Sequence, residues 1–137
     1  MNKWEALEYV LKNEHTKAPL EFWSDQEFVF NAVHWNGFNF RFANDKLKKD
    51  KEFVLKVVKY CGYAFEYADN YLKKDRAFVL KAIEYNASVL KYADISLRMD
   101  KKYILQILQA YKPALEYVDT LLKNNEEFLN MLNNSND

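Results

Sequence analysis

A repeat of 25 residues is the feature of this sequence that most restricts its fold. The stretch LKKDKEFVLKVVKYCG at residues 47–62 returns as LKKDRAFVLKAIEYNA at residues 72–87. Each repeat starts with an aspartate in the same register, and an asparagine opens a shortened fifth copy: Asp25, Asp50, Asp75, Asp100 and Asn125. Such a period is typical of chains in which one small structural unit stacks on the next.

The first half of each repeat has the pattern of an α-helix, which we name helix A. An aromatic residue stands three positions after the start, and apolar residues follow it at a helical spacing, as in FVLKVV at residues 53–58. The starting Asp or Asn is a favoured N-cap residue, because its side chain accepts a hydrogen bond from a backbone N–H. We expect helix A to end near Asn36-Gly37 and its counterparts, where glycine can adopt the left-handed backbone that closes a helix.

The second half of each repeat reads FNFRFANDKL, YAFEYADNYL, SVLKYADISL and PALEYVDTLL in turn. Alternation of apolar and polar residues would allow a strand, but Ala64, Phe65, Ala68 and Leu72 fit a helix better. We therefore predict a second helix, helix B. Aspartates that can cap a further short turn stand within it, so it can be bent or broken there: Asp69, Asp94 and Asp119.

Helix A is apolar around most of its circumference, which requires cover on two sides. The sequence therefore predicts an all-α fold, an α-solenoid of stacked helical hairpins with atypical terminal caps. We expect one domain over residues 1–137, with an N-terminal cap at 1–24, four repeats at 25–124, and a half-repeat and tail at 125–137. Residues 133–137 are expected to fray.

The repeat also carries a family resemblance. Its units read D-x-x-F-V-L-x-A-V-x-x-N-G followed by x-x-L-x-Y-A-x-x-x-L-x-x-D, with the L-x-Y-A phrase at Leu90 to Ala93. This pattern, over residues 25 to about 123, resembles a bacterial helical-repeat domain of unknown function. Ala87 and Pro113 depart from the Asn-Gly turn. The resemblance implies a helical scaffold found in bacterial and bacterial-effector proteins, with no catalytic residues to carry over.

Composition limits the environment in which we expect the chain. Half of its 137 residues are hydrophobic, and 20 basic residues balance 20 acidic ones. No stretch approaches the roughly 18 apolar residues of a membrane helix, and the start MNKWEALEYV does not resemble an export signal. The single cysteine, Cys61, excludes an internal disulfide. We expect a soluble cytoplasmic protein without membrane partners.

The sequence predicts neither an enzyme nor a metal or cofactor site. His34 stands where other repeats have Lys59, Glu84 or Gln109, so we expect it to face solvent, and we expect His15 in an exposed loop. Cys61 falls at a turn, where we interpret it as a packing residue. The aspartates of helix B recur once per repeat, and stacked helices about 8–10 Å apart hold such residues too far apart to share an ion.

Two surfaces remain as candidates for function. A basic edge is expected where lysines and arginines recur at equivalent turns: Lys48, Lys49, Lys51, Lys73, Lys74, Arg76, Arg98, Lys101 and Lys102. It could follow a nucleic-acid backbone. An aromatic patch is expected in the first repeat, where rings exceed what a terminal unit needs for its core: Trp23, Phe30, His34, Trp35, Phe38 and Arg41. It is either a protein-binding patch or additional core of the cap.

The preferred interpretation is a non-enzymatic module that binds another protein, as a small inhibitor or adaptor. Compact chains of this composition resemble stand-alone inhibitors made by bacteria, phages and mobile elements, including inhibitors of bacterial defence nucleases. The alternatives are a nucleic-acid binder that uses the basic edge and a purely structural repeat module.

Overall fold

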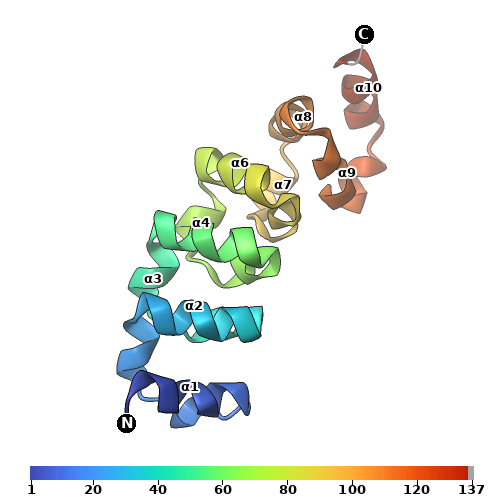
Figure 1. The fold of residues 1–137 in the computed structure, drawn as a ribbon. Coiled ribbons are helices and arrows are strands. Elements are labelled where there is room, and N and C mark those ends of the chain that lie inside the picture. Colours follow the sequence, from blue (N-terminus) through green and yellow to red (C-terminus); the bar gives the residue numbers. More distant parts are fainter. Residues whose placement is uncertain (136–137) are drawn as a thin grey trace. The chain divides into compact units, whose positions relative to one another are not determined.

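The computed structural model describes residues 1–135, and its regular structure is helical throughout that range (Figure 1). The predicted all-α class is therefore confirmed, and the strand alternative for the second half of each repeat is wrong. The chain forms two compact units, Met1–Asp69 and Asn70–Asp137, which we call unit 1 and unit 2 and describe separately.

Unit 1 alternates α-helices with short 3₁₀ helices. Its elements in chain order are α1 (Lys3–Leu11), η1 (His15–Lys17), η2 (Leu20–Ser24), α2 (Gln26–Trp35), η3 (Gly37–Phe42), α3 (Asp45–Lys49), α4 (Lys51–Tyr60) and η4 (Gly62–Tyr67). The α-helices α2 and α4 lie side by side, and so do the 3₁₀ helices η3 and η4 that follow them.

Unit 2 has the same alternation. Its elements are α5 (Asn70–Lys73), α6 (Arg76–Tyr85), η5 (Ala87–Tyr92), α7 (Ile95–Arg98), α8 (Lys101–Ala110), η6 (Lys112–Tyr117), α9 (Thr120–Lys123) and α10 (Glu126–Ser135). Residues 133–135, which we expected to fray, belong to α10. The remaining two positions of that expectation, 136 and 137, lie outside the described residues.

The N-caps predicted for helix A are confirmed by backbone hydrogen bonds. Phe53 donates its backbone N–H to Asp50 Oδ1 at 3.0 Å, and Phe28, Phe78, Tyr103 and Phe128 donate in the same way to the residue three positions before them. Each bond satisfies one N–H that a helix start leaves without a partner in the helix. The starting Asp or Asn thus fixes where each long helix begins.

Helix B is broken in every copy of the repeat. The aspartates within it had indicated that such a break was possible. A 3₁₀ helix comes first, and a short α-helix follows, capped by Asn44 in unit 1 and by Asp94 and Asp119 in unit 2. Backbone bonds join three of these breaks to the preceding segment within the same unit. Asn44 donates to the Trp23 carbonyl at 2.8 Å, Asp69 to Lys48 at 3.0 Å, and Asp94 to Lys73 at 2.9 Å.

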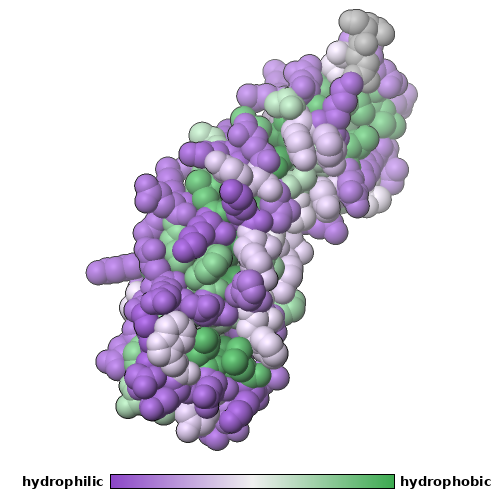
Figure 2. Space-filling model, viewed as in Figure 1, coloured by the Kyte–Doolittle hydropathy of each residue, from purple (hydrophilic) through white to green (hydrophobic). Residues whose placement is uncertain are grey.

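The core of each unit is built from the apolar face of the long helices and the middle of the 3₁₀ helices. Val29, Val54 and Phe65 are fully buried in unit 1, as are Val79 and Ile104 in unit 2. Hydrophilic residues cover most of the visible face, and hydrophobic residues reach the surface between them (Figure 2). No helix among residues 1–135 has the length and hydrophobicity needed to cross a bilayer.

The expected role of glycine at the end of helix A is wrong. No glycine has a positive φ, and Asn13 is the one described residue that does. Gly37 is instead buried at a close contact, because a Cβ there would lie 2.3 Å from Cys61 Sγ and 2.8 Å from Cζ of Tyr63. The turn after α2 therefore needs glycine for its small size.

Candidate protein-binding surface

The predicted aromatic patch of the first repeat is only partly exposed. Trp23 is 3% exposed and packs edge-on against Phe28, with ring centres 5.0 Å apart. Its assignment to a binding patch is corrected, because a buried indole belongs to the core of unit 1. Phe30 is half-buried. Those of the predicted residues that remain exposed are His34, Trp35, Phe38 and Arg41.

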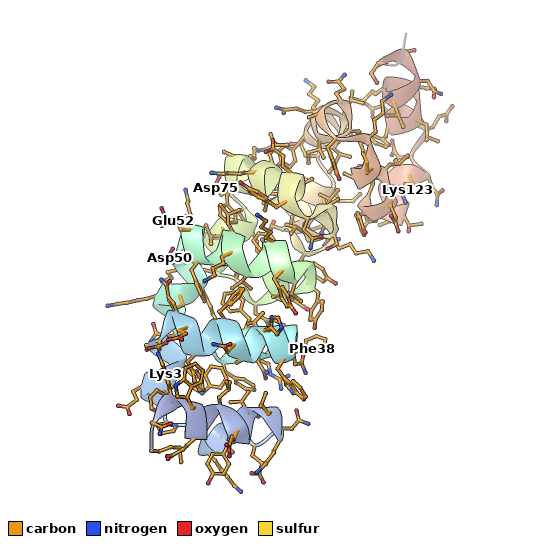
Figure 3. All side chains as sticks on the ribbon, in the orientation of Figure 1. Lys3, Phe38, Asp50, Glu52, Asp75 and Lys123 are labelled. Atoms are coloured by element: carbon orange, nitrogen blue, oxygen red, sulfur yellow. The ribbon has the colours of Figure 1, made fainter. Side chains whose placement is uncertain are left out.

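Trp35 and Phe38 flank the turn between α2 and η3 and present much of their rings to solvent. Trp35 is 60% exposed and Phe38 is 45% exposed. Figure 3 shows Phe38 at the opposite end of α2 from Lys3, whose ammonium group pairs with Glu27 in the first turn of that helix. The end of α2 is therefore a place where large apolar side chains are not enclosed by unit 1.

Sequence reasoning missed three tyrosines of the following copy that join these residues. The Phe38 ring packs against Tyr63, with centres 4.8 Å apart, and against Tyr67, at 6.1 Å. Tyr60 stacks on the His34 ring with centres 4.6 Å apart. The register of the repeat could have identified two of them, because Tyr60 stands 25 residues after Trp35 and Tyr63 stands 25 residues after Phe38.

We define the aromatic surface by the side chains that these contacts and the Phe30–Tyr60 ring contact at 6.1 Å bring together in unit 1, with the addition of the exposed Trp35, which follows His34 at the end of α2: Phe30, His34, Trp35, Phe38, Tyr60, Tyr63 and Tyr67. Lys56 Nζ lies 4.4 Å from the centre of the Phe30 ring, so the surface also carries a cation against one of its rings. The Tyr60 hydroxyl donates to the His34 carbonyl at 3.4 Å, which ties α4 to the end of α2.

Gly37 and Cys61 hold the centre of this surface in place. The Gly37 N–H donates to the Tyr63 hydroxyl oxygen at 3.1 Å. Burial, and then the hydrogen bond with the Cys61 thiol, raise the pKa of the Tyr63 hydroxyl above its ordinary value. The thiol expected as a packing residue therefore supports a ring of the surface. The guanidinium group of Arg41 lies over the Phe42 ring, 4.5 Å from its centre.

The residues of the predicted basic edge are largely engaged in polar contacts within each unit. In unit 1, Lys48 Nζ donates to the Arg41 carbonyl at 2.6 Å, and Lys49 lies 4.0 Å from the Asp69 carboxylate. In unit 2, three members of the edge form ion pairs: Arg76 with Asp100 at 2.6 Å, Arg98 with Asp119 at 3.2 Å, and Lys101 with Glu127 at 2.6 Å.

Two of these ion pairs help to lower the pKa of the acidic partner. The backbone N–H of Tyr103, and then the Arg76 side chain, hold the pKa of Asp100 below its ordinary value. The Lys101 hydrogen bond lowers the pKa of Glu127. Lys51 and Lys73 also have interactions with other described residues. Much of the positive charge of the edge is thus balanced by nearby acidic groups. This weakens the case that the edge binds the phosphates of a nucleic-acid backbone.

The remaining candidates for chemistry do not converge. His15 is half-buried rather than in an exposed loop, and its ring stacks on Phe42 with centres 3.8 Å apart. Within residues 1–135, no group of three His, Cys, Asp or Glu side chains could hold a metal ion. Asp94 and Asp119 act as helix caps, as expected.

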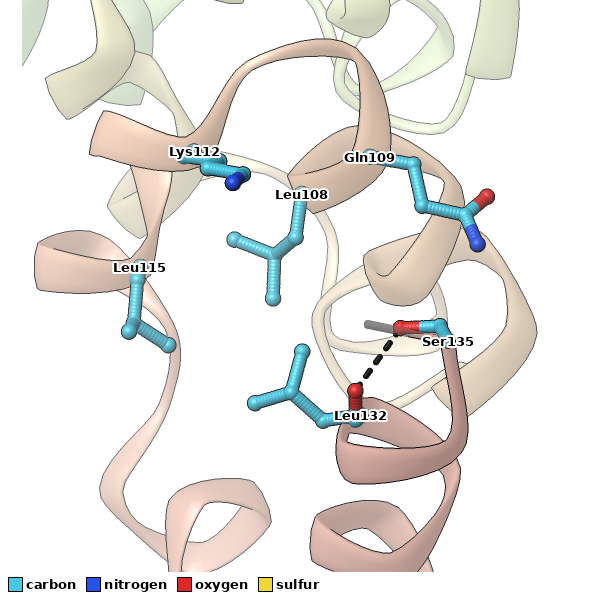
Figure 4. Close-up of a pocket in the computed structure, with 6 residues that line it drawn as sticks. All are labelled: Leu108, Gln109, Lys112, Leu115, Leu132 and Ser135. Atoms are coloured by element: carbon cyan, nitrogen blue, oxygen red, sulfur yellow. Dashed lines mark hydrogen bonds between the residues drawn. The ribbon is translucent and has the colours of Figure 1, made fainter. Parts of the chain in front are cut away.

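A pocket of about 490 Å³ lies in unit 2 between α8, η6 and α10 (Figure 4). Its lining consists of Leu108, Gln109, Lys112, Leu115, Leu132 and Ser135. The Ser135 hydroxyl donates to the Leu132 carbonyl at 2.8 Å, so the polar group beside the leucines is already engaged. Sequence reasoning did not identify this pocket. Among the described residues of its lining, Lys112 is the single ionisable group, so these residues provide no acid-base pair.

Comparison with known families finds a match that carries no described activity. Residues 50–98, from the cap of α4 to the end of α7, match a family described as a domain of unknown function (DUF4116). No curated protein and no solved structure is significantly similar to the chain.

Proposed function

We propose that the chain is a non-enzymatic protein-binding module, an α-solenoid of 25-residue repeats whose aromatic surface in unit 1 meets the partner. The observation that carries the proposal is the exposure of Trp35, Phe38 and Tyr60, at 60%, 45% and 49%. Tryptophan and tyrosine are the residues that most often anchor protein interfaces, and rings clustered on a surface provide a dry centre for one.

The repeat architecture is supported by the register of the helices. The long helices after α1 start at Gln26, Lys51, Arg76, Lys101 and Glu126, each one repeat after the last. The backbone bonds donated by residues 44, 69 and 94 recur in the same register. A chain whose helix caps and connecting backbone hydrogen bonds recur with one period has the organisation expected of stacked helical repeats.

Binding is favoured over catalysis by the kinds of side chain that the aromatic surface collects. It offers rings, hydroxyl groups and a cation, and His34, its one imidazole, is stacked on Tyr60 rather than paired with an acid. An inhibitor or adaptor needs only such a recognition surface. The free thiol of Cys61 is consistent with action in the reducing cytoplasm, which we propose as its location.

The proposal is tested by Trp35→Ala and Phe38→Ala with a matched control. Trp4 is also exposed, at 54%, but lies in the first turn of α1, and the control variant is therefore Trp4→Ala. The tagged full chain and its variants are used to capture partners from cells that express it, with nuclease added, followed by affinity measurement on the captured protein. We expect each first-repeat change to weaken binding by at least about 2 kcal/mol and Trp4→Ala to change it little.

Two results would contradict this proposal. Equal capture by the wild type, Trp35→Ala and Phe38→Ala would place the binding surface elsewhere on the chain. Loss of capture on nuclease treatment would show that nucleic acid mediates the interaction, and the basic edge would become the better candidate.

A further inference from the structure

We infer that the pocket of unit 2 between α8, η6 and α10 binds a small molecule made of an aliphatic chain that ends in an anionic group. The site is separate from the aromatic surface of unit 1 and goes beyond the proposed function. Three observations support it: the equivalent space one copy earlier is filled by protein, the apolar walls here stay open, and a lysine stands where other copies have a small residue.

Within unit 2, the space equivalent to this pocket one copy earlier is filled. The 3₁₀ helix η6 packs there against both η5 and α8. The counterparts of the three pocket leucines are at most 1% exposed: Ile83, Leu90 and Ile107. Unit 1 has the same arrangement, because η4 packs against η3 and α4, and Phe40, the counterpart of Leu90, is fully buried. The repeat therefore forms an apolar space at this place that is stabilised when an apolar group occupies it.

In the last copy that the structure describes, the same space is open. Leu115 is 42% exposed, whereas its counterpart Leu90 is 1% exposed. Figure 4 shows Leu108, Leu115 and Leu132 facing one space. The volume of about 490 Å³ lies within the range of about 300–1,000 Å³ that is typical of small-molecule sites. The described lining offers leucine walls and no aromatic ring, which suits a flexible aliphatic chain better than a flat ring system.

Lys112 distinguishes this space from a seat for one more copy of the repeat. Small residues stand at the equivalent position of the other copies: Gly37, Gly62 and Ala87. In unit 1, Cys61 and Tyr63 of the following copy lie so close to Gly37 that even a Cβ there would overlap them. A following copy packed in this way would collide with the side chain of Lys112. The space beside Lys112 is thus suited to a different occupant.

The charge of Lys112 determines the end group of that occupant. Lys112 is the one ionisable residue in the described lining, and its ammonium group has no acidic partner within residues 1–135. In Figure 4 this ammonium group lies at one end of the space between the leucines. An anionic end group there would form a charge-assisted hydrogen bond, while the aliphatic chain would displace water from the leucines. Fatty acids and single-chain lipid phosphates share this chemistry.

The test titrates the full-length chain with decanoate and, separately, with decyl phosphate, and follows the leucine methyl signals by NMR. We expect saturable shifts of the Leu115 and Leu132 signals below about 1 mM with at least one of the two anions, and the anion that binds more tightly identifies the source. Leu47, which is buried in unit 1, should show no shift. Decanol lacks the charge and acetate lacks the chain, so each should bind at least about tenfold more weakly.

A matched pair of lysine variants tests the role of the charge. Lys112→Gln should weaken binding of the anion by at least about tenfold, whereas Lys81→Gln, at an exposed position of α6 outside the pocket, should change it by less than about twofold. Binding of decanol should be the same in both variants.

Four results would overturn the inference. They are the absence of a saturable shift with either anion, equal binding of decanol, equal effects of the two lysine changes, and leucine shifts that depend on protein concentration without any ligand. The last result would assign the pocket to contact between two molecules of the chain. None of them bears on the proposed function, because the pocket and the aromatic surface share no residue.

Discussion

The ends of the long helices differ between the two units in their aromatic residues. In unit 1, α2 ends with Trp35 and its 3₁₀ helix presents Phe38, whereas in unit 2, α6 ends with Tyr85 and its 3₁₀ helix carries Ser88. The next pair differs further, since Tyr60 and Tyr63 of unit 1 correspond to Ala110 and Pro113 of unit 2. The same backbone pattern thus carries four aromatic residues at these positions in unit 1 and one, Tyr85, in unit 2.

The interiors of the two units vary much less. Val29 and Val54 in unit 1 correspond to Val79 and Ile104 in unit 2, and all four are completely buried. Two polar differences inside are satisfied: the Tyr103 hydroxyl, where unit 1 has Phe53, donates to the Arg76 carbonyl at 2.7 Å, and the Asn39 amide, where unit 2 has Val89, donates to the Ala32 carbonyl at 2.9 Å. Burial raises the pKa of Tyr103 to about 12. The comparison teaches that packing limits which residues can occupy the buried face of a helix. The residues at the helix ends can vary, so a surface that recognises a partner can differ from one unit to the other.

The largest effect should come from a position that both units use in the same way. Phe53→Ala in unit 1 and Phe78→Ala in unit 2 should each lower the free energy of unfolding by about 3–5 kcal/mol, because each removes a buried ring. Urea unfolding measures the loss. Trp35→Ala serves as the exposed comparison and should cost less than about 0.5 kcal/mol. A loss below about 1 kcal/mol for either phenylalanine would mean that its ring is not packed as the structure shows.

The sequence was sufficient for the features that depend on neighbouring residues. Asp50 and Phe53 stand at cap spacing, and the apolar face that follows identifies α4 without reference to the rest of the chain. The 3₁₀ form of Gly62–Tyr67 could not be distinguished from an α-turn, because apolar residues fill both kinds of helix at similar positions.

The aromatic surface was only half predictable because its members come from two copies of the repeat. His34 and Phe38 are close in sequence, but their contacts with Tyr60 and Tyr63 depend on how α4 packs beside α2. Trp23 was misassigned because it lies in the irregular N-terminal segment, where no equivalent position in another copy indicated that its side chain is buried.

A second prediction compares the turns that follow α2 and α6. Gly37→Ala in unit 1 should cost about 1–3 kcal/mol, because the new methyl group overlaps Cys61 Sγ and the Tyr63 ring. The equivalent residue of unit 2 already has a Cβ, so Ala87→Gly should cost less than about 1 kcal/mol. Thermal unfolding with calorimetry measures both changes.

A further variant tests the cause of the Gly37 effect. Cys61→Ala in the Gly37→Ala background should recover part of the lost stability, because it removes the nearest overlapping atom. Equal stability of Gly37→Ala and the wild type would show that the turn has room that the structure does not.

The smallest effect concerns charge at a cap of unit 2. Asp100→Asn keeps a side-chain oxygen for the Tyr103 N–H but removes the carboxylate that pairs with Arg76. Because the folded-state pKa of Asp100 is lowered, its charge stabilises the fold above the unfolded pKa of about 3.9, and this stabilisation is lost as the pH falls through the folded value. At pH 7 the variant should lose less than about 1 kcal/mol.

The control for this charge effect is Asp50→Asn, at the equivalent cap of unit 1. Unfolding of both variants and the wild type should be measured from neutral pH down to below the unfolded pKa of Asp. The difference between Asp100→Asn and the wild type should shrink as the pH falls. A difference that grows under acid would contradict the assigned direction of the Asp100 pKa.

The backbone bonds that residues 44, 69 and 94 donate to the preceding copy restrict how this chain can change in length. Deleting or duplicating one whole repeat leaves each remaining donor opposite an equivalent carbonyl, whereas adding a single residue between a donor and its acceptor puts that joint out of register. We therefore expect duplication of a complete unit to be tolerated better than a short insertion at these positions. Each added unit would bring a further helix end on which a different recognition surface can arise.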